Sequence, residues 1–455
     1  MASDGLDTPY GQFAGDFLAD DLANLCDPTS GIQTGPFGSQ LHQKDYVPVG
    51  TPIITVEHLG ENRILHRDLP RVSDADRDRL SRYLLREGDI VFSRVGSVDR
   101  RALVRQEEDG WMFSGRCLRV RPNPGKIDSS YLSYFFGHPT FKEHIRAIAV
   151  GATMPSLNTS LLSSVIVPHP PDLDEQRAIA HILGTLDDKI ELNRRRNQTL
   201  EAMARALFKD WFVDFGPVRA KMEGREPYLP PDLWQLFPDR LDDEGKPEGW
   251  KMVPASELIE FNPTEALRRA TPAPYLDMAS LPTSGSWPDV PILREFGSGM
   301  RFRNGDTLLA RITPCLENGK TAFVQCLPNE TVGWGSTEYI VMRPKAPVPP
   351  AYGYLLARDG AFRDHAIRSM TGTSGRQRAQ GDSVAAFKVA SPSDAKLWET
   401  FGHQITPLFQ SIKANAEVSV NLAGLRDTLL PRLISGELRI KNVERFMENI
   451  NEGTE

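Results

Sequence analysis

An internal repeat constrains this chain more than any other feature of its sequence. The segment GDIVFSR at Gly88–Arg94 matches GDTLLAR at Gly305–Arg311, and further pairs follow at an offset of about 222 residues. Their preserved order predicts a tandem duplication of one domain followed by one helix; chance similarity between two mixed domains is the alternative. The further pairs are Gly110-Trp111 with Gly333-Trp334, Arg121-Pro122 with Arg343-Pro344, Phe141–His144 with Phe362–His365, and Asn193 with Asn415.

Each half of the chain ends in a predicted long helix. Apolar residues alternate at spacings typical of a heptad seam over 179–211 and again over 401–433. The predicted helices cover 172–216 and 393–436. Asn193 and Asn415 occupy equivalent seam positions, where a lone polar residue usually fixes register. We therefore assign them a structural role and no chemistry.

Both helices carry typical start and stop signals. Asp172 follows Pro170-Pro171 and is a candidate N-cap, with Glu175 placed as in a capping box. Gly216-Pro217 is expected to end the first helix. The signals of the second helix are Asp394 after Ser391-Pro392 at its start and Gly436 at its end.

The two helices are expected to pack on each other as an antiparallel coiled coil, because a two-fold relation between like units is the commonest arrangement. Each has about 40 residues and would span roughly 60 Å at 1.5 Å per residue. The expected fold is therefore mixed α/β: two α/β domains joined by two long helices, with a pseudo-two-fold repeat.

The predicted domains are 1–171 and 250–392. A proline-rich linker over 217–249 is expected between the halves, and a polar tail over 437–455 follows the second helix. Predicted strands are Ile53–Val56, Asp89–Ser93, Met112–Val120, Val165–Val167, Thr307–Ala310, Tyr339–Met342 and Ala386–Ala390. Predicted helices are Ser130–Phe136, Pro139–Ala149 and Tyr352–Ile367.

Composition places the chain among ordinary globular proteins. Of its 455 residues 40% are hydrophobic, and no apolar run is long enough for a transmembrane helix. The four cysteines form no CxxC pair, so we expect no metal site of that kind and a reducing cytoplasm. A net charge of -7 does not favour nucleic-acid binding, although a DNA surface needs only a local basic patch.

Common catalytic motifs are missing from the sequence. It contains no GxxxxGK[ST], HExxH or GxSxG, no GxGxxG after a strand, and no (N/D)PP(Y/F) loop of an amino-methyltransferase. This favours recognition over catalysis, so we predict no catalytic residue and no cofactor or metal held by this chain.

Several loops combine glycine, hydroxyl and arginine residues. The stretch Arg82–Arg121 has nine arginines and six acidic residues, so it is locally basic. Arginine binds phosphate or reads guanine, and a single arginine is more often solvated or bound to phosphate than base-reading. For the loop Thr34–Ser39, the alternative is a plain turn with Phe37 anchored in the core. The DNA-binding candidates are Gly35, Phe37, Gly38, Ser39, Ser93, Arg94, Ser97, Arg100, Arg101, Arg311, Asn318, Lys320, Arg376, Gln377 and Arg378.

A dense aromatic segment, Trp211-Phe212-Val213-Asp214-Phe215, lies at the end of the first helix. Part of it must pack locally. The remainder, with Trp211, Phe212 and Phe215, is a candidate interface with a partner protein, because aromatic residues are enriched in interface cores.

One stretch of the sequence resembles a known family. Pro170–Phe215, PPDLDEQRAIAHILGTLDDKIELNRRRNQTLEAMARALFKDWFVDF, closely resembles the first spacer helix of the specificity (S) subunit of type I DNA restriction–modification systems. Gly35–Leu41, Glu248–Trp250 and Leu430–Leu438 resemble other segments of that family. The first half lacks the tryptophan entry motif, and GPFGS has no twin in the second half, where Asn262-Pro263 stands. These departures suggest two domains that read different DNA sequences.

The resemblance implies a non-catalytic cytoplasmic subunit with two target-recognition domains, which read the halves of a bipartite, asymmetric site in double-stranded DNA. It implies that the antiparallel helices set the gap between the half-sites. Two methyltransferase (M) subunits would methylate adenine with S-adenosylmethionine, and two restriction (R) subunits would supply ATP- and Mg-dependent translocation and cleavage. Two alternatives remain: a fused or degenerate DNA methyltransferase or nuclease, and a coiled-coil scaffold that does not act on DNA.

Overall fold

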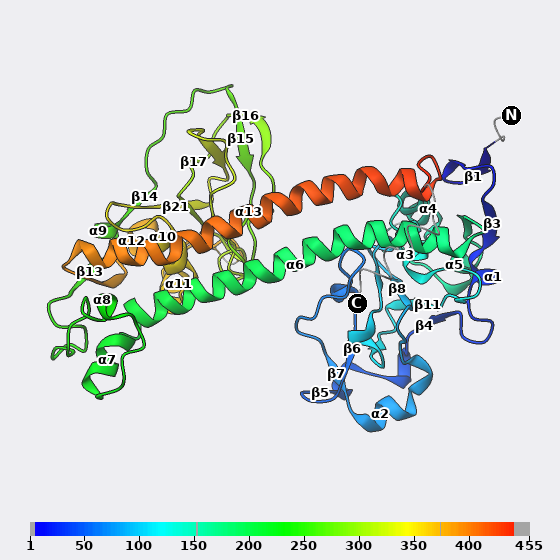
Figure 1. The fold of residues 1–455 in the computed structure, drawn as a ribbon, viewed down its shortest axis with the longest axis horizontal. Coiled ribbons are helices and arrows are strands. Elements are labelled where there is room, and N and C mark those ends of the chain that lie inside the picture. Colours follow the sequence, from blue (N-terminus) through cyan, green and yellow to red (C-terminus); the bar gives the residue numbers. More distant parts are fainter. Residues whose placement is uncertain (1–4, 152, 374, 441–455) are drawn as a thin grey trace. The chain divides into compact units, whose positions relative to one another are not determined.

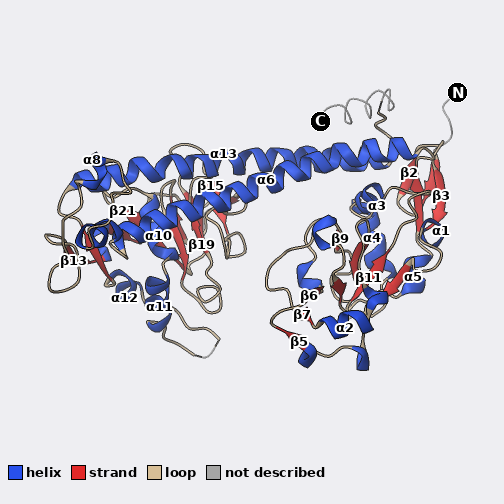
Figure 2. Ribbon diagram, turned by 60° about the horizontal axis from the view of Figure 1, so that its bottom comes forward, coloured by secondary structure: helices blue, strands red, loops and turns tan. Residues whose placement is uncertain are grey.

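The computed structural model describes residues 5–151, 153–373 and 375–440, apart from the side chain of Ser39 (Figure 1). The chain forms two compact units. Unit 1 comprises residues 1–189 with 421–455, and unit 2 comprises residues 190–420. Both are mixed α/β, as predicted, with helices packed on small sheets (Figure 2). Among the described residues, no helix is long and apolar enough to cross a membrane.

Unit 1 is built around a four-stranded antiparallel sheet in the order β4-β11-β8-β9. A second sheet has the order β10-β6-β7-β5, with β10 parallel to β6, and β12 pairs with β3. The strands are β1 (Leu6–Thr8), β2 (Gly11–Phe13), β3 (Leu18–Asp21), β4 (Ile32–Thr34), β5 (Tyr46–Val47), β6 (Thr51–Ile54), β7 (Arg71–Val72), β8 (Ile90–Ser93), β9 (Arg101–Leu103), β10 (Met112–Phe113), β11 (Cys117–Val120) and β12 (Ile166–His169). The helices are α1 (Leu22–Leu25), α2 (Asp74–Arg79), α3 (Ser129–Phe135), α4 (Pro139–Ile148) and α5 (Thr159–Ser163).

Unit 2 has the same kind of sheets, in the orders β14-β21-β18-β19 and β16-β15-β20-β17. Here β15 and β20 are the parallel pair, and β13 pairs with β22. The strands are β13 (Lys251–Pro254), β14 (Ile259–Phe261), β15 (Pro272–Leu276), β16 (Ile292–Glu295), β17 (Met300–Phe302), β18 (Thr307–Ala310), β19 (Thr321–Phe323), β20 (Gly333–Gly335), β21 (Tyr339–Pro344) and β22 (Lys388–Ser391). The helices are α7 (Gly216–Met222), α8 (Pro231–Trp234), α9 (Ala255–Leu258), α10 (Ala351–Arg358), α11 (Gly360–Arg368) and α12 (Gly381–Ala385).

The repeated GD and RP residues of the sequence form a buried ion pair in each main sheet. Arg121 donates two hydrogen bonds to Asp89, at 2.8 and 2.7 Å, and Arg343 donates two to Asp306, both at 2.7 Å. The glycine before each aspartate has a left-handed backbone, with φ of 85° in unit 1 and 93° in unit 2, which explains why glycine recurs there. The most similar residues of the two halves therefore stabilise the main sheet of each domain. We call this sheet with its buried ion pair the frame of the domain.

Two predicted elements are divided in the structure. Met112–Val120, predicted as one strand, forms β10 and β11, because a turn closed by the Cys117 N–H and the Ser114 carbonyl (2.9 Å) separates them. Tyr352–Ile367, predicted as one helix, forms α10 and α11. Asp359 is extended there and caps α11 by accepting the Phe362 N–H at 3.1 Å.

Two 40-residue helices, α6 (Leu173–Phe212) and α13 (Ala395–Ile434), contribute to both units. Within unit 2 they are linked by amides: Asn193 donates to the Ser419 hydroxyl at 3.2 Å, and Asn415 donates to the Asn197 side chain at 2.9 Å. Asn197 also donates to the Ile412 carbonyl at 3.2 Å. The seam asparagines thus contact the facing helix and pair their polar groups there.

The ends of α6 differ from the prediction. Asp172 accepts the Asp174 N–H at 2.9 Å, whereas Glu175 binds Arg439 (2.7 Å) instead of completing a capping box. The helix ends at Phe212, before the predicted residue 216. Phe215 takes the left-handed conformation (φ 54°) expected of a glycine, and Gly216 begins α7 with proline in its first turn.

The aromatic end of α6 is buried, so the prediction of an exposed partner interface there is wrong for Trp211 and Phe212. Their side chains are 1% and 5% exposed and belong to the core of unit 2. Phe212 stacks on Trp398, with ring centroids 4.7 Å apart. Phe215 is partly buried against the same core. These rings are thus buried against other residues of unit 2.

The segment 217–249, expected to be a surface linker, contains α7 and α8 and packs on unit 2. Phe237 is 2% exposed and meets Trp211 edge to face at 5.1 Å. The predicted tail 437–455 is described only to residue 440. In that part, Arg439 forms ion pairs with Asp16 and Glu175, and residues 441–455 lie outside the described residues.

Candidate nucleic-acid interface

The loop after β8 in unit 1 and the loop after β18 in unit 2 are held by equivalent backbone hydrogen bonds. The Arg94 N–H donates to the Arg116 carbonyl at 2.8 Å, and the Arg94 carbonyl accepts from Leu157 at 2.8 Å. In unit 2 the Arg311 N–H donates to the Glu338 carbonyl at 3.0 Å, and its carbonyl accepts from Ala379 at 2.8 Å. Arg94 and Arg311 are therefore structural counterparts, as the repeat predicts.

A second loop is bridged onto the first in both units. Ser156 forms β-bridges with Val95 and Val150 in unit 1, and Arg378 forms them with Ile312 and Thr371 in unit 2. Two loops that are distant in sequence thus form one surface in each unit. We call these surfaces recognition loops 1 (residues 94–100, 114–116, 150–151 and 153–157) and recognition loops 2 (residues 311–320, 336–338, 371–373 and 375–379).

In unit 1, two arginines and one aromatic ring lie together. Arg94 donates to the Gly115 carbonyl at 3.1 Å, and its guanidinium carbon lies 5.8 Å from the centroid of Phe37. Arg116 is exposed beside it. Phe37 is 60% exposed, so the alternative that this ring anchors the loop in the core is wrong. An exposed ring beside guanidinium groups can contact a nucleic acid through its face or its edge.

The two glycines of the loop that contains Phe37 have different roles. Gly35 is buried, and a Cβ there would lie 2.2 Å from the Ser114 carbonyl oxygen. The close approach of these two backbone segments therefore requires glycine. Gly38 is exposed with φ of 63° and open space around it. Gly38 thus stays a DNA-contact candidate, whereas Gly35 is explained by packing. The side chain of Ser39 lies outside the described part of the chain.

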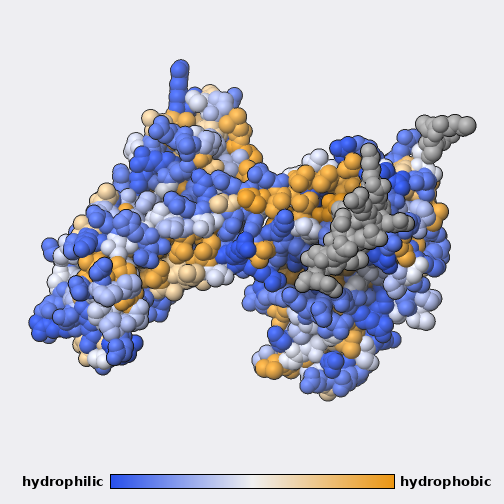
Figure 3. Space-filling view, in the orientation of Figure 1, coloured by the Kyte–Doolittle hydropathy of each residue, from blue (hydrophilic) through white to orange (hydrophobic). Residues whose placement is uncertain are grey.

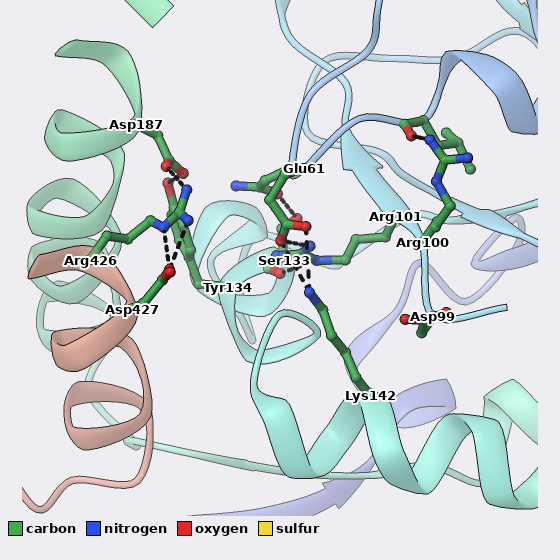
Figure 4. Close-up of polar contacts among 12 residues, drawn as sticks. Glu61, Asp99, Arg100, Arg101, Ser133, Tyr134, Lys142, Asp187, Arg426 and Asp427 are labelled. Atoms are coloured by element: carbon green, nitrogen blue, oxygen red, sulfur yellow. Dashed lines mark hydrogen bonds and ion pairs between the residues drawn. The ribbon is translucent and has the colours of Figure 1, made fainter. Parts of the chain in front are cut away.

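Two predicted DNA-binding residues of unit 1 belong to the interior instead. Ser93 is fully buried and donates to the Val95 carbonyl at 2.9 Å. Arg101 is 2% exposed; it donates to the Ser133 carbonyl at 3.0 Å and to Glu61 at 2.8 Å (Figure 4). Neither can reach DNA in this conformation. A single arginine in a basic stretch gives no sequence signal that separates burial from exposure.

Arg100 and Ser97 occupy the end of the same loop. Arg100 is half-buried and donates to the Leu59 carbonyl, and Ser97 is exposed. Ser97 therefore remains a contact candidate, whereas the Arg100 guanidinium already serves the neighbouring loop.

Recognition loops 2 are centred on a carboxylate. Glu338 accepts from Arg311 Nε at 3.2 Å and from Arg378 Nε and Nη2 at 2.9 and 2.7 Å. The two guanidinium groups hold the pKa of Glu338 below its ordinary value, Arg378 having the larger effect. Arg376 is exposed, while Gln377 is half-buried and accepts the Thr313 N–H through its backbone carbonyl at 3.0 Å. The structure thus brings together the segments that carry Arg311, Arg376 and Arg378, three of the predicted DNA-binding residues.

Asn318 and Lys320 belong to the same loops with different exposure. Asn318 is exposed. Lys320 donates to the carbonyl oxygens of Met278 and Ala279, at 2.6 and 3.3 Å, so its ammonium group ties two loops together. The lysine is better explained by that contact than by DNA binding.

Sequence reasoning missed Arg116 and Glu338. They stand at matching places directly before β11 and β21, so an alignment of the two halves around Cys117 and Tyr339 would have paired them. Their opposite charges are the clearest chemical difference between the two sets of loops.

One group of metal-ligand types occurs among the described residues: atoms of His66, Glu107 and Glu108 lie within 4.8 Å of one another. His66 and Glu108 already share a hydrogen bond of 2.5 Å, and Glu108 also accepts the Arg105 N–H at 2.8 Å. We assign no metal to it.

Residues 37–202 match the family described as the type I restriction modification DNA specificity domain. The chain is 25% identical over 338 residues to the type I restriction enzyme MjaIX specificity subunit of Methanocaldococcus jannaschii, covering 71% of this chain and 72% of that protein. It is 23% identical over 431 residues to the HindI specificity subunit of Haemophilus influenzae, covering 83% and 92%. The chain is thus similar to type I restriction–modification specificity subunits over most of its length. The crystal structure of the type I S subunit from M. genitalium is similar in fold, with a TM-score of 0.54 and 14% identity over 92% of this chain and 96% of that one.

Proposed function

We propose that this S subunit recognises DNA for a type I restriction–modification complex, and that each unit reads one half of a bipartite, asymmetric site. One observation carries the proposal. Arg94 and Arg311 occupy the same backbone position of the same frame, while the side chains around them differ. A shared frame presents the loops to a duplex in the same manner, and different side chains select different bases.

The local charge of the loops suits this role although the whole chain is acidic. Arg94 and Arg116 lie in recognition loops 1, and in recognition loops 2 Arg311 and Arg378 contact one glutamate while Arg376 is exposed. Guanidinium groups bind phosphate oxygens and read guanine edges. We therefore propose that binding depends strongly on salt, as expected when phosphate contacts supply much of the affinity.

We further propose that α6 and α13 form an antiparallel coiled coil, that a pseudo-two-fold relates the two repeats, and that these helices set the gap between the half-sites. The heptad pattern supports this. So do the helix–helix contacts within each unit: in unit 2 Asn193 meets Ser419 and Asn197 meets Ile412, and in unit 1 Asp187 meets Arg426.

The partners we propose are two M subunits, which bind S-adenosylmethionine and methylate adenine, with two R subunits that use ATP and Mg for translocation and cleavage. The helices provide the docking surface in this proposal. In unit 2 they expose apolar side chains, Met203 at 50%, Val418 at 49% and Val420 at 42%. Figure 3 shows hydrophobic surface along α13. Contiguous exposed apolar surface marks protein interaction sites. These side chains replace the buried aromatic end of α6 as interface candidates.

The test is a domain exchange read by methylome sequencing. Residues 1–171 are replaced by the first domain of another S subunit, and the chimera is expressed together with the M subunit with which this chain forms a complex. One half of the methylated sequence should change completely, while the other half and the gap stay the same.

A reciprocal exchange of residues 250–392 is the matched control, and it should change the other half only. If both halves changed together in either chimera, the assignment of one half-site to each unit would be overturned. Adenine methylation that required no sequence at all would overturn the recognition role itself.

A further inference from the structure

The carboxylate of Glu338 has an unusual position for a surface that binds polyanionic DNA. Its side chain is 20% exposed, and it lies between the guanidinium groups of Arg311 and Arg378, which are 34% and 39% exposed. A negative charge at this place weakens the attraction of both arginines for phosphate. The arrangement therefore needs another explanation than phosphate binding.

The hydrogen bonds leave one end of Arg311 unused. Glu338 binds Arg311 through Nε only, and within the described part of the chain no acceptor contacts Arg311 Nη1 or Nη2. These two nitrogens form the end-on fork that matches guanine O6 and N7 in the major groove. Arg378, in contrast, turns Nε and Nη2 onto the carboxylate and directs Nη1 to the Arg376 carbonyl at 3.3 Å.

The backbone around this group is fixed at three points. Arg311 is the residue after β18, Glu338 is the residue before β21, and Arg378 is bridged to Ile312 on one side and Thr371 on the other. An arginine held by its Nε from such a frame loses little further side-chain freedom when it binds a base, which favours precise reading over loose attraction.

Unit 1 has an arginine, and not a carboxylate, at the position equivalent to Glu338. Arg116 stands where unit 2 has Glu338, so Arg94 is held by the Gly115 carbonyl and the Phe37 ring and meets no acid there. The acid is therefore a property of one half-site reader and not of the repeated frame.

We propose that Arg311 reads a guanine in the half-site of unit 2, and that Glu338 is a positioning residue that holds the Arg311 guanidinium side-on for this contact. Arg378 neutralises the carboxylate, so that the group keeps one net positive charge toward the DNA. This inference rests on the proposed function, and it adds the base and the residues that select it.

The experiment uses the complex of the full chain with its M subunits and a DNA library randomised over both half-sites, sequenced after binding at several salt concentrations. In Arg311→Lys the charge remains but the fork is lost. Preference for guanine at one position of one half-site should fall about 5- to 150-fold, as expected for a bidentate base contact. Glu338→Gln should relax the same position, by a smaller factor, and leave the other half-site unchanged.

Arg116→Gln is the matched control in unit 1, since it alters the equivalent position without touching Arg311; it should leave the guanine preference intact. A loss of affinity that is the same for all sequences, with a flatter salt dependence, would show that Arg311 holds a phosphate and would overturn the proposal. Unchanged preference in Glu338→Gln, in a complex that still selects guanine there, would remove its positioning role. A wild-type complex that selects no sequence would instead contradict the proposed function.

Discussion

Both units hold α6 to the α/β domain by a tyrosine–carboxylate hydrogen bond, Tyr134–Asp187 in unit 1 and Tyr354–Glu201 in unit 2, and they differ in the contacts around it. In unit 1, Tyr134 of α3 donates to Asp187 of α6 at 2.8 Å, and Asp187 accepts from Arg426 of α13 at 2.7 Å (Figure 4). In unit 2 aromatic contacts accompany the hydrogen bond: Tyr352 of α10 contacts Phe208 of α6 and Trp398 of α13, with ring centroids 5.4 and 5.0 Å apart. Hydrogen bonds define geometry at modest net energy, whereas buried rings contribute more free energy.

The two domains thus share the same frame, whereas the contacts that attach them to the helices differ. The ion pairs Asp89–Arg121 and Asp306–Arg343 are alike in geometry. The joins and the recognition loops have diverged. Substitutions in the frame should therefore have equal effects in the two units, and substitutions in the joins should have unequal ones.

The largest effect is expected from Phe212→Ala. It removes a buried ring that contacts several aromatic neighbours, so unit 2 should lose about 3–5 kcal/mol of stability. Hydrogen–deuterium exchange, read by peptide, should show faster exchange throughout residues 250–412, with a smaller change in residues 5–170. Phe215→Ala, at a partly buried ring, is the matched control with a smaller loss. Equal acceleration in both units would contradict a local aromatic join.

The ion pairs of the two frames predict equal losses of stability in unit 1 and unit 2. Asp89→Ala leaves the largely buried Arg121 without a carboxylate, and Asp306→Ala does the same to Arg343 when it is combined with Glu265→Ala, because Arg343 also pairs with Glu265 (2.5 Å); each variant should cost about 3 kcal/mol in its own unit. The measurement is peptide-level exchange in both variants. A difference above about 1 kcal/mol between the two would show that the ion pairs are not equivalent parts of a duplicated frame.

The fold could be predicted where the sequence repeats or keeps a period. The heptad seam predicted both long helices to within a few residues, and GDTLLAR predicted β18 from Thr307 to Ala310. The turn between β10 and β11 was missed, because Ser114-Gly115-Arg116 interrupts a run that otherwise favours strand. Likewise, helix propensity does not report the extended Asp359 that separates α10 from α11.

The candidate site was harder to predict, because exposure is decided by tertiary contacts. Arg94 and Arg101 look alike in sequence, yet only Arg101 is enclosed, by Glu61 and the Ser133 carbonyl. Trp211 and Phe212 were predicted to form an interface because α13, whose Phe401 and Trp398 contact them, lies far along the chain. Glu338 attracted no attention, since a lone acid has no motif.

A moderate effect is expected in the polar join of unit 1. Asp187→Ala removes the acceptor of Tyr134 and Arg426, and it should cost about 1–3 kcal/mol, seen as faster exchange in α3 and in residues 421–434. Asp427→Ala is the matched control, because its side chain is 65% exposed and its pair with Arg426 is screened. If Asp187→Ala cost as much as Phe212→Ala, the polar join would be as strong as the aromatic one.

The smallest effect concerns Glu61, which supports the same join through Arg101. Arg101 Nη1 and Lys142 Nζ lie 2.8 and 3.2 Å from Glu61 Oε1. Burial acts to raise the pKa of Glu61, but these two cations outweigh it and hold the pKa at about 2. An unfolded glutamate titrates near ~4.3. The stabilisation is thus present above ~4.3 and is lost as the pH falls toward the folded pKa.

Glu61→Gln should therefore lower stability at pH 7 by less than about 1 kcal/mol, because the side chain is 56% exposed and its ion pairs are screened. Urea unfolding at pH values from 7 down to about 2 should show the difference from wild type shrinking and then disappearing. Glu143→Gln, at an exposed residue of the same helix as Lys142, is the control and should give no such trend. A difference that stayed constant over this range would mean that Glu61 acts through the shape of its hydrogen bonds and not through its charge.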